Sequence, residues 1–81
     1  MDAQTIDLSK SVYELCKEYP NLVLILDEIG FHDIAKPGML ASVGRFMTIP
    51  KGAAAKKIDR NRILGMLYEH GFEIINEDLL R

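Results

Sequence analysis

The chain has 81 residues, of which 48% are hydrophobic and 27% are charged, and its formal net charge at pH 7 is −2. This composition excludes a disordered protein, and the length allows one domain, which we expect to span residues 1–81. No apolar stretch approaches the ~20 residues that cross a membrane, and the first residues lack a hydrophobic signal segment, so we expect a cytoplasmic protein.

The N-terminal part predicts a short, capped helix. Residues 1–10 read as irregular or briefly extended chain. Ser11 and Glu14 then have the spacing of a capping box, in which each side chain accepts a hydrogen bond from the backbone N–H of the other residue. Apolar residues follow at helical spacing as far as Tyr19. The helix should end before Pro20, because the residue that precedes a proline avoids helical backbone angles.

A second helix should run from Pro20 to Gly30, since proline suits a first helical turn and glycine suits the residue that ends a helix. Its apolar run over residues 22–26 also fits a β-strand, but the two acids and the glycine that follow favour a helix. Phe31 should fold back onto the last apolar turn. The same Leu-x-Glu-x-Gly-Phe phrase returns at residues 67–72.

Residues 32–47 predict a long connector between the two halves. A Pro-Gly turn interrupts it at residues 37–38, and one short helical turn fits residues 39–42. Its apolar side chains should pack over the core; they are Met39, Leu40, Val43, Phe46 and Met47. Thr48 is the expected N-cap of the next helix, over residues 49–57, whose small residues let another helix approach closely.

The fourth helix should run from Arg60 to His70, with Asp59 as its N-cap. Gly71 should end this helix, and Phe72 should fold back onto it. Each half of the chain then contains a short helix, a turn and a longer helix that ends in Gly-Phe. We therefore predict an all-α domain: a compact bundle of four main short helices, arranged as two helical hairpins with a long packed connector.

Few residues point to catalysis. The sequence lacks Cys-x-x-Cys, His-Glu-x-x-His and P-loop motifs. The single cysteine, Cys16, excludes an internal disulfide, and its place on an apolar helical stripe predicts a buried, inert thiol. His32 and Asp33 alone do not define a metal site, and His70 suits a surface position at the end of a helix. We therefore expect no enzymatic activity, no catalytic or metal-binding residues and no cofactor.

Positive charge is concentrated in one segment. Residues 45–62 carry six bases and one acid, a net +5, whereas both flanking segments are acidic. Arg45 precedes the start of a helix, where unpaired amides and the helix dipole attract anions. A phosphate or carboxylate could bind there, and the candidate ligand-binding residues are Pro37, Met39, Arg45, Thr48 and Lys51. The alternative is structural: Arg45 pairs with an internal acid or a backbone carbonyl and pins the connector.

Two stretches carry the motif of a known family: Gly30-Phe31-x-x-Ile34-x-x-Pro37-Gly38-Met39-Leu40 and Gly44-Arg45-Phe46-Met47-Thr48-Ile49-Pro50-Lys51-Gly52. They resemble the domain of unknown function 1858 family over residues 4–70. This resemblance implies a small all-α domain that occurs alone or beside sensor modules. Related domains are the redox-disulfide domain associated with the hybrid cluster protein and the N-terminal domain of iron–sulfur cluster repair proteins. Those relatives have cysteines where this chain has His32-Asp33-Ile34, so it resembles the branch without the cysteine motif.

We therefore expect a noncatalytic module that binds a protein partner or a small anion, away from membranes and as a monomer or a homodimer. One alternative is a nucleic-acid-binding helix–turn–helix over residues 49–70, but the negative net charge argues against nucleic acid. The other alternative is an accessory to redox or iron–sulfur metabolism, which the family resemblance alone implies.

Overall fold

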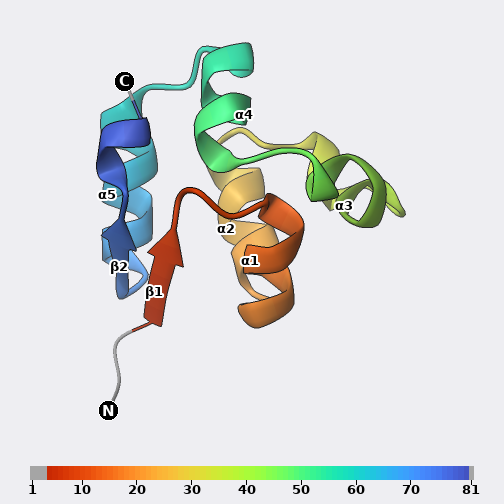
Figure 1. The fold of residues 1–81 in the computed structure, drawn as a ribbon, viewed down its shortest axis with the longest axis horizontal. Helices are drawn as coiled ribbons and strands as arrows, with labels where there is room; N and C mark the ends of the chain where they lie inside the picture. Colours follow the sequence, from red (N-terminus) through yellow and green to blue (C-terminus); the bar gives the residue numbers. More distant parts are fainter. Residues whose placement is uncertain (1–3, 81) are drawn as a thin grey trace.

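A computed structural model describes residues 4–80 and shows a small mixed α/β fold (Figure 1). These residues form five α-helices and two β-strands, so the prediction of an all-α bundle of four helices is wrong. None of the helices within this range is long and apolar enough to cross a membrane. The elements in chain order are β1 (Gln4–Asp7), α1 (Val12–Glu18), α2 (Leu22–Ile29), η1 (Asp33–Ala35), α3 (Met39–Ser42), η2 (Val43–Arg45), α4 (Ile49–Lys56), α5 (Arg60–Glu69), β2 (Phe72–Ile75) and η3 (Glu77–Leu79), where η marks a 3₁₀ turn.

The two strands pair in parallel although they lie near opposite ends of the chain. Gln4 pairs with Phe72 and Asp7 with Ile75, and the Leu8 N–H donates to the Ile75 carbonyl oxygen (3.2 Å). Parallel strands need a long crossover connection, and here all five helices lie between them along the chain. Each strand has only four residues, which is too short for apolar alternation to distinguish it from irregular chain. The sequence pattern therefore did not predict the sheet.

Short polar side chains cap two helices as the sequence predicts. Ser11 Oγ accepts a hydrogen bond from the Glu14 N–H (3.1 Å), and Glu14 Oε1 accepts one from the Ser11 N–H (3.2 Å), which completes the capping box of α1. Thr48 Oγ1 accepts a hydrogen bond from the Lys51 N–H (3.2 Å) at the start of α4. Asp59 stands at the N-cap position of α5, but its side chain makes no capping hydrogen bond.

Both Gly-Phe phrases turn the chain and bury an aromatic ring. Gly30 (φ 140°) ends α2, and Phe31 beyond it is fully buried. Gly71 (φ 84°) follows α5, and Phe72 is buried as the first residue of β2, which packs against α5. A side chain at either φ angle would strain the backbone, so glycine suits these two corners. Helix α2 begins at Leu22, two residues later than its expected start at Pro20.

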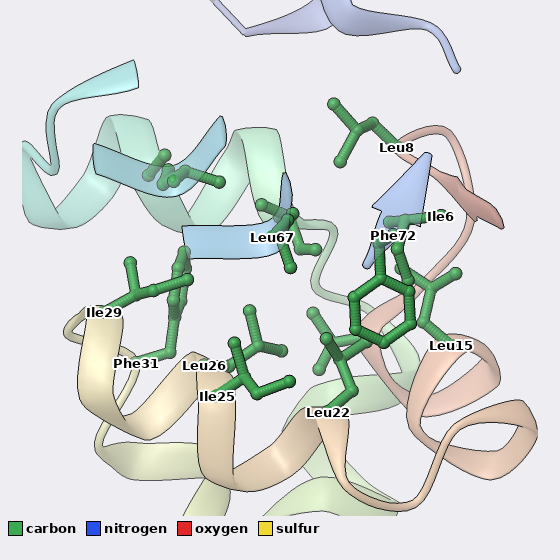
Figure 2. Close-up of a cluster of buried hydrophobic side chains, with 14 of the residues drawn as sticks. Ile6, Leu8, Leu15, Leu22, Ile25, Leu26, Ile29, Phe31, Leu67 and Phe72 are labelled. Carbon is green, nitrogen blue, oxygen red and sulfur yellow. The ribbon is translucent and has the colours of Figure 1, made fainter. Parts of the chain in front are cut away.

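One hydrophobic cluster joins the helices to the sheet. Figure 2 shows side chains from both strands and from α1, α2 and α5 that point toward one another, among them Ile6, Leu15, Leu22, Leu67 and Phe72. The Phe72 ring meets the Tyr19 ring edge-on, with 5.3 Å between the centroids. The Tyr19 hydroxyl in turn accepts a hydrogen bond from the Thr5 N–H (3.1 Å). Tyr19 thereby fixes the end of α1 to both strands.

The connector between α2 and α4 lies at the far end of the molecule from the sheet (Figure 1). The helical turn predicted over residues 39–42 is confirmed as α3. Leu40 and Met47 pack against the core. In contrast, Phe46 is 82% exposed and Val43 is 39% exposed. The prediction that all apolar side chains of the connector pack over the core is therefore wrong for these two residues.

Candidate functional site

Two glycines let the connector pack closely on its neighbours. Gly44 is buried, and a Cβ added there would lie 3.1 Å from Leu40 Cδ1 and 3.6 Å from the backbone nitrogen of Tyr13. Gly52 in α4 faces the ring of Phe31, since an added Cβ would lie 2.5 Å from Phe31 Cε1. Both glycines are therefore explained by packing inside the fold.

The segment that leads into α4 is held by backbone contacts to α1. The Val12 N–H donates to the Met47 carbonyl oxygen (2.7 Å), and Ser11 and Thr48 form an antiparallel bridge. Thr48 is also the cap of α4, and Ile49 is fully buried. These contacts set the direction of the chain on both sides of Phe46.

Arg45 holds the connector through an aromatic ring. Its guanidinium carbon lies 4.7 Å from the centroid of the Tyr13 ring, on α1. Such a cation–π contact contributes about 0.5–1 kcal/mol at an exposed site. The partners expected for Arg45 from the sequence were an anion, an internal acid or a backbone carbonyl, and Tyr13 was not among them. The contact favours a structural role for this residue.

Phe46 differs from the residues around it because its ring points away from the fold. It stands directly after η2 and borders a shallow hollow of about 260 Å³. The lining, which we name the Phe46 face, consists of Val43, Phe46, Met47, Lys51, Gly52 and Ala55. Burial of a phenylalanine side chain gains about 1.5–3 kcal/mol, which the isolated fold forgoes here.

Of the five residues predicted to bind a ligand, Lys51 lines this hollow. Thr48 is half-buried and its hydroxyl oxygen serves as the helix cap, while Arg45 lies over Tyr13. Pro37 is exposed at the start of the turn before α3, and Met39 is half-buried in α3. The sequence did not point to Phe46 or Val43, because apolar residues of the connector were expected in the core, nor to Ala55, because the small residues of its helix were expected to face another helix.

Lys56 uses its charge inside the molecule. Its Nζ lies 3.0 Å from Asp33 Oδ2, and this contact joins α4 to η1 in the connector. Lys36 Nζ lies 3.7 Å from the other carboxylate oxygen of Asp33. The hydrogen bond and charge of Lys56, helped by Lys36, hold the pKa of Asp33 below its ordinary value of 3.8. Lys36 and Lys56 are thus both paired with Asp33.

Arg62 also has an internal partner. It donates from Nη2 to the Glu28 carbonyl oxygen and from Nε to the Ile29 carbonyl oxygen, both at 3.0 Å. The last carbonyl groups of a helix have no partner within the helix, so Arg62 caps the C-terminal end of α2 from α5. In the described part of the chain, Lys51 and Lys57 are the basic residues of the 45–62 segment that have no acid, carbonyl or aromatic partner.

A larger hollow, of about 550 Å³, lies where α4 ends and α5 begins. Its lining includes Lys57 and Arg60 but also Asp59, so opposite charges share it. Arg60 Nε already donates to the Leu80 carbonyl oxygen (3.0 Å), which ties α5 to the C-terminal segment. One of its cations is therefore engaged within the fold, whereas Lys51 of the Phe46 face has no ion pair in the described part of the chain.

The groups considered for chemistry have structural surroundings in the described part of the chain. Cys16 is 4% exposed, so the prediction of a buried thiol is confirmed, and burial raises the pKa of this thiol to about 11. His32 Nδ1 lies 2.8 Å from Asp27 Oδ1 on the surface. Over residues 4–80 there is no group of three or more side chains that could together hold a metal ion.

The described residues thus form a small mixed α/β domain with a buried thiol and one protruding aromatic side chain on a well-anchored connector. The chain belongs to the family called domain of unknown function (DUF1858), whose model matches residues 6–64. The resemblance seen in the sequence is therefore confirmed.

One solved structure is similar over nearly the whole chain. It is described as the crystal structure of the conserved domain protein from Streptococcus pneumoniae TIGR4. The two chains are 33% identical with a TM-score of 0.85, and the likeness covers 93% of this chain and 94% of that one. No curated protein matches the chain.

Proposed function

We propose that this domain is a noncatalytic protein-interaction module and that the Phe46 face is its contact surface. The observation that carries this proposal is the 82% exposure of Phe46. The other two phenylalanines, Phe31 and Phe72, are 0% and 4% exposed. The glycines, the threonine and the arginine near Phe46 all have internal contacts, so a role outside the domain is the remaining explanation for its position.

The surroundings of Phe46 suit a small contact with another protein. Aromatic residues are enriched among the few side chains that supply most of the binding energy at interfaces. Met47 lines the hollow beside it, and methionine adapts its shape to different partners. Because the connector is fixed to α1 and α4, the ring is presented by a rigid segment. Binding therefore costs little conformational entropy on this side.

We propose that the anion suggested by the sequence is a carboxylate of the partner protein. Lys51 borders the apolar hollow and has no ion pair with any acid in the described part of the chain. A partner that inserts an apolar side chain beside Phe46 and places an acid near Lys51 would satisfy both features. Charges at the rim of an interface raise the association rate and specificity more than the affinity.

The two alternatives receive less support. A nucleic-acid-binding surface needs a strong positive charge. Lys56, Arg60 and Arg62 instead contact an acid or backbone carbonyl groups within the fold, which reduces the positive charge available to a nucleic acid. For redox chemistry, Cys16 is buried and the high pKa of its thiol disfavours the reactive thiolate. An accessory role in iron–sulfur metabolism rests on family resemblance alone.

Site-specific photo-crosslinking in the native cell tests the proposal. A benzophenone side chain would replace Ala55, which lines the hollow and is exposed. We expect a discrete covalent adduct on illumination, and we expect its loss when Phe46→Ser is added. The matched control places the same probe at Asn61, an exposed residue of α5 outside the hollow. Equal adducts from both positions, or an Ala55 adduct that survives Phe46→Ser, would contradict the proposal.

A further inference from the structure

A second apolar side chain, Leu24, protrudes from the surface. An acidic residue, Glu28, borders the hollow beside it, whereas a basic residue, Lys51, borders the hollow beside Phe46. Leu24 is 68% exposed, and together with Phe46 it is the most exposed large hydrophobic residue of the described chain. Helix α2 buries its other stripe in the core, which leaves Leu24 on the outer side. A hollow of about 310 Å³ adjoins it, and its lining, which we name the Leu24 face, consists of Asn21, Leu24, Ile25, Glu28 and His70.

The two faces are built alike. Each combines one protruding apolar side chain with a shallow hollow, and the two hollows are similar in size, at about 260 and 310 Å³. In a contact between the two faces, Leu24 of one molecule would lie against the hollow beside Phe46 of another, and Phe46 would lie against the hollow beside Leu24. A single contact of this kind would cover both exposed apolar residues.

The two faces are complementary in charge. Lys51 borders the Phe46 face and Glu28 borders the Leu24 face, and neither side chain has an ion-pair partner among residues 4–80. Arg62 contacts the backbone of Glu28, but its guanidinium donates to two carbonyl groups, whose partial negative charge offsets it. Contact between the faces would place Lys51 opposite Glu28.

We propose that copies of this chain associate with the Phe46 face of one molecule against the Leu24 face of another. The proposal rests on the proposed function, since it takes the Phe46 face as a contact surface and names a second copy as its occupant. Charge favours this pairing over contact between two Phe46 faces, which would bring the Lys51 side chains of both copies together. Like charges in contact cost affinity, which disfavours that arrangement.

The contact is small, so the association is weak. Two faces of five or six residues each fall short of the 20–30 residues per side that are usual in a stable interface. We therefore expect dissociation constants on the order of 10⁻⁴ to 10⁻³ M, a range typical of low-affinity encounters. If two molecules make the contact twice, each offering both of its faces to the other, they form a closed two-fold dimer. If each face contacts a different molecule, the copies form an open chain.

Sedimentation and amide chemical shifts over a dilution series test the association at low ionic strength. We expect the weight-average mass to rise between about 20 μM and 1 mM, and we expect concentration-dependent shifts at residues of both faces. The charge reversals Lys51→Glu and Glu28→Lys should each weaken association about threefold or more, since each replaces an attraction by a repulsion. The double variant, which restores opposite charges across the contact, should recover most of the lost affinity.

A matched pair of reversals, Lys57→Glu and Glu73→Lys, serves as the control, because both residues are exposed and lie outside the two faces. These variants should associate like the wild type. A mass that stays monomeric at 1 mM, or charge-reversal variants without rescue in the double variant, would overturn the inference. If the protein is monomeric but the Ala55 probe still crosslinks to a different protein through Phe46, self-association fails while the proposed function stands.

Discussion

The two Gly-Phe corners and the Gly-Arg-Phe segment of the connector use similar residues with opposite results. At residues 30–31 and 71–72, a glycine with positive φ reverses the chain and the phenylalanine that follows is buried. At residues 44–46, Gly44 does not have a positive φ, the chain closes a 3₁₀ turn and the ring of Phe46 is exposed. The comparison teaches that backbone direction, rather than hydrophobicity, decides which phenylalanine stabilises the fold and which is free to bind.

The largest expected effect is that of Phe31→Ala. The ring is fully buried, and removal of a buried phenylalanine side chain costs about 3–5 kcal/mol, because a cavity adds to the lost transfer energy. Since a domain of this size has a free energy of unfolding near the lower end of about 5–15 kcal/mol, we expect most of the stability to be lost. Urea denaturation followed by circular dichroism measures the change.

A folded Phe31→Ala variant that loses less than about 1 kcal/mol would show that the buried corner is not a main source of stability. Phe31→Leu provides a milder variant for the case in which Phe31→Ala does not fold. Leucine keeps most of the apolar volume, so we expect a smaller loss than for alanine and a cooperative transition that can still be fitted.

The next largest effect concerns the close contact between Gly52 and the ring of Phe31. Gly52→Ala should destabilise the protein by about 1–3 kcal/mol, because the new methyl group meets the buried ring of Phe31. Gly65→Ala is the matched control, since Gly65 is also helical but an added Cβ there has no neighbour within 4 Å. The control should stabilise α5 by up to about 1 kcal/mol. Thermal unfolding of both variants measures the contrast, and equal shifts in Tm would contradict it.

The sequence predicts those features of the structure that depend on residues close together in the chain. Ser11, Thr48 and Gly30 act on residues within one helical turn, so their effects are readable from adjacent positions. The sheet joins Gln4 to Phe72, so its pairing links segments near the two ends of the described chain. No local pattern contains that information. The sequence therefore predicted four helix positions well and the fold class wrongly.

The candidate site was hard to predict for a related reason. Composition indicates that the connector is apolar, but it does not indicate which of its side chains face the core. The direction of Phe46 depends on the hydrogen bond from Val12 to Met47 and on the contact of Arg45 with Tyr13. Both contacts reach back to α1, more than thirty positions earlier in the sequence. The exposure of Phe46 is thus a tertiary property.

A smaller effect concerns the ion pair that ties the connector to α4. Lys56 lowers the pKa of Asp33 from its ordinary value of 3.8 in the folded state, so the pair stabilises the fold fully above that value. The stabilisation is lost as the pH falls through the lowered pKa of the folded state. We expect Lys56→Met to lower stability at pH 7 by less than Gly52→Ala does, and to have little effect at a pH below the folded pKa. NMR titration of the Asp33 carboxyl should show its pKa rise toward 3.8 in the variant; an unchanged pKa would contradict this reading.

The smallest effect on stability should come from Phe46→Ser. The ring of Phe46 is 82% exposed, so its removal should change the free energy of unfolding by no more than about 0.5 kcal/mol. The same variant should abolish the Ala55 crosslink and weaken self-association, because an aromatic anchor that contributes little to folding is free to contribute to binding. Chemical denaturation measures the first quantity and sedimentation the second. A loss of several kcal/mol would mean that the ring packs against its own domain in solution, and the contrast between Phe46 and the two buried corners would then disappear.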